Sequence, residues 1–135
     1  MSFLSDRRRR RACFQGGGDE QVHAFLDRRP LFFGHVLVVP RSHVATLAEL
    51  PSDAIGPFFT FVARMEAAVR LGCDAPGTFV AMNNVVSQSV AHLHVHVVPR
   101  RPKDGLRGFF WPRTRYPDDE IARSVAARIA TELSR

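Results

Sequence analysis

Three histidines alternate with aliphatic residues in one short segment of the chain. His92, His94 and His96 are separated by single apolar residues, and two valines follow. Because side chains alternate along a β-strand, this spacing predicts one strand from His92 to Val98 with all three imidazoles on one face. Neighbouring imidazoles on such a strand stand ~6.6 Å apart at the backbone. The pattern therefore predicts a row of imidazoles on one surface.

A row of imidazoles suits chemistry at phosphorus. One ring can attack the electrophile and form a covalent intermediate, while its neighbours hold its tautomer and protonate a leaving group. Zinc binding is the main alternative, because His-x-His on a strand is good metal geometry. The first and third imidazoles stand ~13 Å apart at the backbone, however, and zinc–nitrogen bonds are only ~2 Å long. A zinc site that combines one or two of these histidines with other ligands stays open.

Polar residues at the ends of neighbouring segments fit the same chemistry. Gln88 and Ser89 stand just before the histidine row, and Asn83 ends the preceding apolar run. Asp27 follows another apolar run, where its carboxylate suits a vicinal diol such as ribose. Taken alone, Asp27 fits a turn equally well. Together these residues predict a cradle for an anion.

The elements that must position these residues can be read from the local pattern. Segments rich in β-branched and aromatic residues predict strands at 22–26, 34–39, 78–82 and 92–98. Ser52 is a good helix cap, apolar residues then recur at helical spacing, and Gly72 is placed to end that helix. Three acids predict the start of a last helix, from about Asp118 to Leu133. Mostly sequential strands with two segregated helices predict the α+β class.

Composition limits the classes of protein that remain. The chain has 135 residues, 45% of them apolar, which is the size of one domain with a buried core. No apolar run is long enough for a membrane helix, and only two cysteines are present, so we expect a reduced, cytoplasmic protein without a membrane partner. The net charge is +6, and Arg7–Arg11 supply five of these charges. We therefore expect a flexible basic leader over residues 1–20 and a single domain over 21–135.

The histidine row and its flanking segments together resemble a known family. The segment 92–98 matches the motif His-φ-His-φ-His-φ-φ, in which φ is apolar, and the segments 24–27, 34–43 and 88–90 match further blocks in the same order. The sequence resembles the histidine triad (HIT) superfamily of Hint-like and Fhit-like nucleotide hydrolases over roughly residues 21–100. The resemblance implies an antiparallel sheet of about five strands, one central helix, a C-terminal helix and a homodimer.

The same resemblance implies roles for the residues of the row. His94 is the nucleophile that attacks an α-phosphate and becomes nucleotidylated, and water or another acceptor then releases the nucleotide. His92 and His96 contact phosphate oxygens and support the nucleophile. Gln88 and Ser89 match polar residues near the phosphate and the leaving group. No metal or other cofactor is required for this step.

A nucleotide pocket is also implied, for a purine and in particular adenine. Asp27 matches the carboxylate that holds the ribose hydroxyls, and Phe25 matches a wall of the base pocket. Asn83 matches a polar residue near ribose and phosphate. His35 matches a histidine that lies close to the site in Hint-like members.

Two departures from the family pattern concern zinc and the tail. Many bacterial members bind structural zinc through a Cys-x-x-Cys pair together with the equivalents of His43 and His92. Here Cys13 has no second cysteine three residues on, so Cys13 and His43 are only remnants of such a site. In some members the C-terminal segment reaches the active site, which makes Trp111, Arg113 and Arg115 candidate substrate or partner contacts.

These features favour a nucleotidyl hydrolase that acts on dinucleoside polyphosphates or nucleoside phosphoramidates. Arg100, Arg101 and Arg107 follow the row, and their positive charges favour a substrate with a long polyphosphate. One alternative is an enzyme that removes adenylate from nucleic acid ends, in which the basic leader binds nucleic acid. Another is a purine-nucleotide binding module without catalysis.

Overall fold

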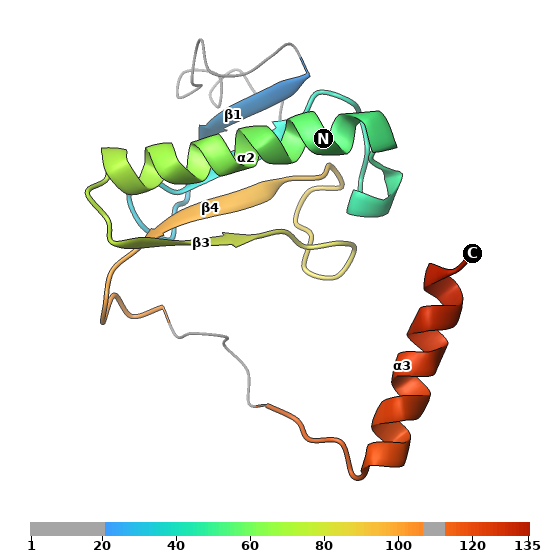
Figure 1. The fold of residues 1–135 in the computed structure, drawn as a ribbon. Coiled ribbons are helices and arrows are strands. Elements are labelled where there is room, and N and C mark those ends of the chain that lie inside the picture. Colours follow the sequence, from blue (N-terminus) through green and yellow to red (C-terminus); the bar gives the residue numbers. More distant parts are fainter. Residues whose placement is uncertain (1–20, 107–112) are drawn as a thin grey trace. The chain divides into compact units, whose positions relative to one another are not determined.

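The structure is a computed structural model that describes residues 21–106 and 113–135. It contains two compact units, one up to Asp104 and one from Gly105, and each is described by itself. The domain boundary expected at residue 21 and the single domain expected over 21–135 stay predictions. The elements of the first unit, drawn in Figure 1, are β1 (Val22–Leu26), β2 (Val36–Pro40), a 3-10 helix (Leu47–Glu49), α2 (Ser52–Gly72), β3 (Gly77–Ala81) and β4 (Val95–Arg100).

The four strands form one antiparallel sheet in the order β1-β2-β4-β3. His96 lies in β4, opposite Leu37 of β2 on one side and Ala81 of β3 on the other. The α+β class is therefore confirmed. The described residues contain the four strands that the local pattern predicts, against the five or so that the family resemblance implies.

The largest difference from the sequence-based expectation concerns the start of β4. The strand begins at Val95, so His92 and His94 lie in the segment that precedes it. A turn closed by the bond from the His92 N–H to the Val90 carbonyl, 2.8 Å, interrupts the extended chain. The Leu93 N–H then donates to the Val44 carbonyl, 2.8 Å away, outside the sheet ladder. The expectation of one strand with three imidazoles on one face is therefore wrong.

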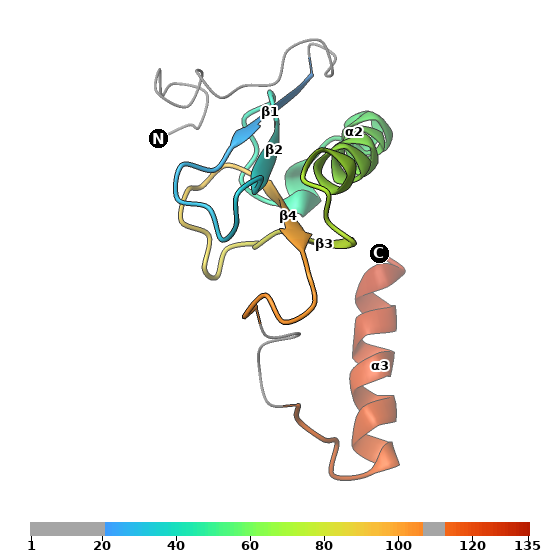
Figure 2. The same ribbon diagram turned by 90° about the vertical axis from the view of Figure 1, so that its left-hand side faces the viewer.

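Helix α2 covers one face of the sheet, as Figure 2 shows from the side. Its apolar residues recur at helical spacing and are buried: Phe58, Phe61, Val62, Met65 and Val69. The helix begins at Ser52 after Pro51, and no side chain caps it, so the expected capping role of Ser52 is not observed. Burial of this stripe against the strands contributes more to the helix than any cap would, because apolar area removed from water is the dominant favourable term.

Alternation along the strands separates the two faces of the sheet. Val36 and Val38 of β2 pack in the core beneath α2, whereas Leu37 and Val39 join Phe25 in a second cluster. In β4, Val95 and Val97 belong to the core beneath α2. His96 stands between them in the strand and therefore lies on the face opposite α2, together with the second cluster.

The second unit contains α3 (Asp119–Leu133). Asp118 caps this helix by accepting a hydrogen bond from the Ile121 N–H at 2.8 Å, and Asp119 and Glu120 lie in the first turn, as the acidic run predicts. Arg113 is exposed, and Trp111 lies outside the described residues. Among the described helices, none combines the length and the apolar character that a membrane span requires.

Candidate functional site

His94 is buried directly before β4 with one ring nitrogen committed to the backbone. Its Nδ1 lies 2.7 Å from the backbone carbonyl oxygen of His92. A carbonyl oxygen only accepts, so Nδ1 carries the proton and Nε2 keeps its lone pair. The His94 side chain lines a cavity of about 230 Å³. The lining of this cavity therefore includes an imidazole whose Nε2 carries no proton.

The cavity lies on the face of the sheet opposite α2. Its lining comes from the turn after β1, from β2, from the segment before β4 and from β4 itself: Asp27, Arg29, Leu37, Ser89, Val90, His94 and His96. Three of the predicted site residues, Asp27, Ser89 and His96, thus share one cavity with His94. Arg29 lines the same cavity and was not predicted as a site residue.

A chain of hydrogen bonds sets the tautomer of His96. The Leu31 N–H donates to His35 Nδ1 at 3.1 Å, so the neutral His35 ring carries its proton on Nε2. That Nε2–H donates to His96 Nδ1 at 2.9 Å. His96 consequently carries its own proton on Nε2 and can donate it to a ligand. The rings of His94 and His96 are 5.1 Å apart, so an acceptor and a donor stand side by side.

His35 and His96 are both neutral near pH 7, because the protein lowers the pKa of each ring. Burial, followed by the nearby His94 and His35, lowers the pKa of His96 from 6.5 to about 4. Burial also lowers the pKa of His35, although the Asp27 carboxylate opposes that shift. Near pH 7, His96 therefore offers a hydrogen bond and no formal charge.

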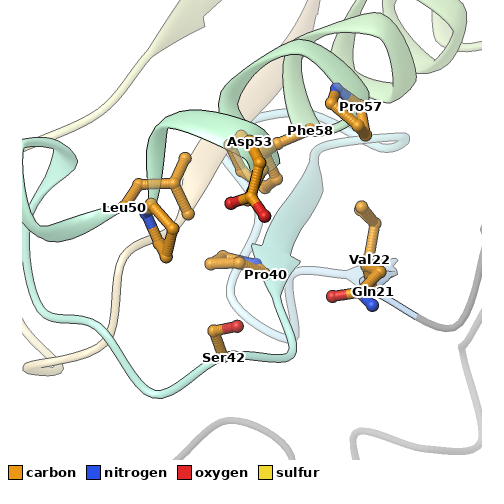
Figure 3. Close-up of a pocket in the computed structure, with 10 residues that line it drawn as sticks. Gln21, Val22, Pro40, Ser42, Leu50, Asp53, Pro57 and Phe58 are labelled. Atoms are coloured by element: carbon orange, nitrogen blue, oxygen red, sulfur yellow. The ribbon is translucent and has the colours of Figure 1, made fainter.

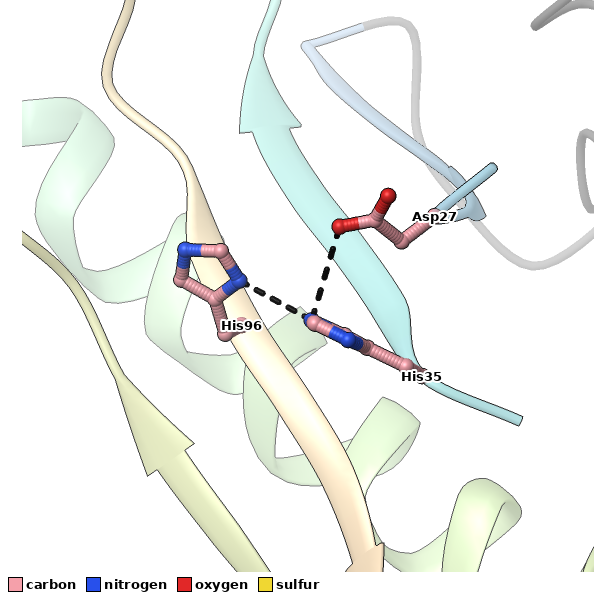
Figure 4. A group of neighbouring side chains, drawn as sticks. All are labelled: Asp27, His35 and His96. Atoms are coloured by element: carbon pink, nitrogen blue, oxygen red, sulfur yellow. Dashed lines mark hydrogen bonds and ion pairs between the residues drawn. The ribbon is translucent and has the colours of Figure 1, made fainter. Parts of the chain in front are cut away.

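Asp27, His35 and His96 form the one group of three candidate metal ligands among the described residues (Figure 4). Asp27 Oδ2 lies 3.8 Å from His35 Nε2, which in turn bonds His96. A metal-bound histidine normally donates its second N–H to an acceptor. Here His35 Nδ1 accepts from Leu31, so binding of a metal at Nε2 would leave the ring without a proton. The geometry therefore fits a hydrogen-bonded chain better than a metal centre.

His92 is turned away from the cavity. Its side chain is buried, its Nε2–H donates to the Pro40 carbonyl oxygen at 2.9 Å, and its ring meets the edge of His43 at 5.4 Å. In the described ranges no cysteine or carboxylate joins His43 and His92 in a group of three ligands, and Cys13 lies outside those ranges. Two histidines do not complete a tetrahedral zinc site, so His43 and His92 do not form one with the other described residues.

The remaining predicted residues lie around the cavity and do not line it. Phe25 is buried with Leu37 and Val39 and packs beneath the cavity wall. The Gln88 amide donates to the Ala45 carbonyl, and the Asn83 amide donates to the Ser87 carbonyl at 3.2 Å. Both amides thus shape the loop that leads to the histidines.

A larger cavity of about 390 Å³ lies at the other end of β2 (Figure 3). Leu50, Phe58 and Pro40 contribute to its lining, and Asp53 is its ionisable group. It contains none of the histidines of the row. The smaller cavity is therefore the one with groups that can carry out a reaction.

Comparison with known proteins agrees with this geometry. The family model for the HIT domain matches residues 14–103. A HIT-like protein of Methanocaldococcus jannaschii is 41% identical over 110 residues, which cover 79% of this chain and 84% of that protein. A crystal structure of a HIT family member from Bacillus subtilis aligns with a TM-score of 0.78 at 30% identity, covering 89% of this chain and 86% of that one. An adenosine 5'-monophosphoramidase of Candida albicans is 27% identical over 121 residues, covering 85% of this chain and 79% of that protein. With the motif, the fold and the paired His94 and His96 in one cavity, the chain belongs to the HIT family.

Proposed function

We propose that the protein is a nucleotidyl hydrolase that cleaves at the α-phosphate of its substrate through a nucleotidyl-His94 intermediate. Its substrates are dinucleoside polyphosphates or nucleoside phosphoramidates, with adenine as the favoured base. The observation that carries the proposal is the fixed tautomer pair in the cavity. His94 Nε2 has a lone pair, and the neighbouring His96 Nε2 has a hydrogen to donate.

Each group in the cavity has a place in the reaction. His94 Nε2 forms a bond to phosphorus, and the bond from phosphorus to the leaving group breaks. The His96 N–H and the Ser89 hydroxyl bind oxygen or nitrogen atoms at the reacting centre, where charge develops. Asp27 accepts hydrogen bonds from the ribose hydroxyls. Water then attacks the phosphorus of the intermediate and releases the nucleotide and free His94.

The relatives support the general class of this activity. One is named as an adenosine 5'-monophosphoramidase, and both that name and the proposal concern a nucleotide substrate with a bond to phosphorus. Two of the arginines that favoured polyphosphate do not line the cavity: Arg100 bonds Asp104 at 2.6 Å, and Arg101 donates to two carbonyls after α2. Arg107 lies outside the described residues.

Trapping of the intermediate tests the proposal directly. Wild-type protein is mixed with adenosine phosphoramidate or diadenosine tetraphosphate and quenched in alkali, and its intact mass is measured. We expect a mass increase of one adenylyl group in wild type, none in His94→Ala, and a loss of turnover of at least about a thousand-fold in that variant, because the nucleophile is gone.

A matched control is available in the same chain. His23→Gln removes a histidine that does not line the cavity and should keep both the adduct and the turnover. Turnover by His94→Ala at the wild-type rate would contradict the proposal. Tight binding of AMP by wild type without adduct or turnover would favour the non-catalytic binding module.

The cytoplasmic location and the homodimer are part of the same proposal. Light scattering of the purified chain measures the mass of the assembly. Adenylate removal from nucleic acid ends stays a prediction, because Arg7–Arg11 lie outside the described residues. Deletion of residues 1–11 should weaken DNA binding and flatten its salt dependence if that activity exists.

A further inference from the structure

Arg29 brings a permanent positive charge to the cavity of His94. Its side chain lines that cavity together with Asp27, Ser89 and His96. Its neighbour Arg28 is also exposed but does not line it. The turn after β1 thus contributes both a carboxylate and a guanidinium cation to the site.

The conformation of this turn is held by hydrogen bonds on both sides of Asp27. The Asp27 N–H donates to the His35 carbonyl at 2.9 Å, and Asp27 Oδ1 accepts from the Arg29 N–H at 2.9 Å. The second bond is that of an Asx turn, which fixes the direction of the chain at the residue two positions on. The position of Arg29 at the cavity therefore follows from the same carboxylate that lies beside His35.

Arg29 is also the one lysine or arginine among the lining residues. Leu37, Val90 and Ser89 carry no charge, and His96 is neutral near pH 7 because burial lowers its pKa to about 4. Within the described part of the chain, the ion pairs of the acidic side chains do not involve the Arg29 guanidinium. A phosphate group that reaches Arg29 therefore finds a positive partner there, and a planar guanidinium can hold a phosphate through two hydrogen bonds.

We propose that Arg29 is a specificity-determining residue that binds a second phosphate group of the nucleotide, separate from the phosphate that His94 attacks. In the proposed reaction the attacked phosphate meets Ser89, His94 and His96, which come from the segment before β4 and from β4. Arg29 comes from the turn after β1. The second phosphate belongs either to the 5' polyphosphate chain or to the ribose, and the same guanidinium suits both. This inference rests on the proposed function for its choice of nucleotide ligands.

Calorimetric titration with product nucleotides tests the inference without turnover. AMP, ADP and adenosine 3',5'-bisphosphate are titrated in metal-free buffer into wild type, Arg29→Gln, Arg29→Lys and the control Arg28→Gln. We expect wild type and Arg28→Gln to bind at least one two-phosphate nucleotide about ten-fold more tightly than AMP, which is the size of one charge-assisted hydrogen bond. Arg29→Gln should lose this preference while binding AMP within about two-fold of wild type, and Arg29→Lys should keep part of it.

The ligand that shows the preference identifies the position of the second phosphate. A preference for ADP indicates the polyphosphate chain, and a preference for the bisphosphate indicates the ribose. Equal weakening of all three ligands by Arg29→Gln would overturn the inference, because Arg29 would then contact the phosphate that AMP also has. The absence of any preference in wild type would overturn it as well.

Turnover of adenosine phosphoramidate by the same preparations separates the two proposals. This substrate has no second phosphate, so Arg29→Gln should lower its turnover by a smaller factor than it lowers the affinity for the preferred two-phosphate nucleotide. If wild type shows the binding preference but hydrolyses neither this substrate nor diadenosine tetraphosphate, the proposed hydrolase is wrong and the role of Arg29 in binding stands. If wild type hydrolyses the phosphoramidate but Arg29→Gln keeps the binding preference, the role of Arg29 is wrong and the hydrolase stands.

Discussion

At the scale of single residues, one backbone N–H determines the protonation of the candidate site. The Leu31 N–H donates to His35 Nδ1, and this leaves His35 Nε2 as the donor to His96. His96 then has only its Nε2–H to offer to a ligand. His94 takes the opposite tautomer, with its proton on Nδ1, because Nδ1 donates to the His92 carbonyl. Two identical side chains thus acquire different roles because different backbone groups hold them.

Replacement of His35 tests this chain of hydrogen bonds. In His35→Leu the donor to His96 Nδ1 is gone, so His96 can take either tautomer, and we expect kcat to fall about ten-fold or more. The pKa of His96 should also rise, because the nearby His35 contributes to its depression. Long-range proton–nitrogen NMR measures the tautomer and the pKa of His96. His35→Gln, which keeps a donor, should restore part of the rate; an unchanged His96 tautomer and pKa in His35→Leu would contradict the scheme.

At the scale of elements, the approach to β2 and the approach to β4 both depart from regular strands. β2 begins at Val36, two residues later than the pattern predicts, and Gly34 takes a left-handed conformation with φ of 101°. A Cβ on Gly34 would collide with Cys73 Sγ. Gly34 therefore allows the chain to pass Cys73 and deliver His35 to its place beside His96.

Two glycine substitutions compare this position with an unconstrained one. Gly34→Ala should lower the free energy of unfolding by about 2 kcal/mol, because the new methyl group collides with Cys73 and the backbone conformation disfavours a side chain. Gly72→Ala is the matched control in the last turn of α2, where a Cβ meets nothing within 4 Å. It should raise the free energy of unfolding by about 0.5–1 kcal/mol. Urea denaturation measures both, and a neutral Gly34→Ala would contradict the packing described.

At the scale of the whole molecule, the buried neutral histidines couple stability to pH. The pKa of His96 is about 4 in the folded chain and near 6.5 in the unfolded chain. Above pH 6.5, His96 is neutral in both the folded and the unfolded chain, so its protonation does not lower the free energy of unfolding. Between pH 6.5 and 4 only the unfolded chain binds the extra proton, so the free energy of unfolding falls as the pH falls. His35 shifts in the same direction.

Urea denaturation at pH 7 and at pH 5 measures this coupling. Wild type should lose about 1–2 kcal/mol more between the two pH values than His96→Gln, after allowance for the partial solvent exposure of the ring. His23→Gln controls for the loss of an imidazole outside the cavity. Equal losses in wild type and His96→Gln would show that the His96 pKa is not depressed in the folded chain.

Much of the fold was predictable because its signals are local. The period of β1 and of α2 appears within each segment, and β1 was predicted with its observed bounds. Asp118 was predicted at the start of α3 because a cap and its acids are neighbours in sequence. The start of β4 was not predictable, since the Leu93 N–H finds its acceptor at Val44, far back in the chain. Spacing alone could not reveal that partner.

The sequence by itself determined the family and the four described strands, and it predicted His94 as the reactive imidazole, because the motif, the hydrophobic period and the turn residues all lie within short segments. Only the tertiary structure decided which imidazoles share a cavity. In the folded chain, His92 bonds the Pro40 carbonyl, and His35 bonds His96, which lies 61 residues further on. Arg29 lines the same cavity as His94. These outcomes depend on strand register and on backbone donors from distant segments. No local pattern specifies them, because each requires two parts of the chain to meet.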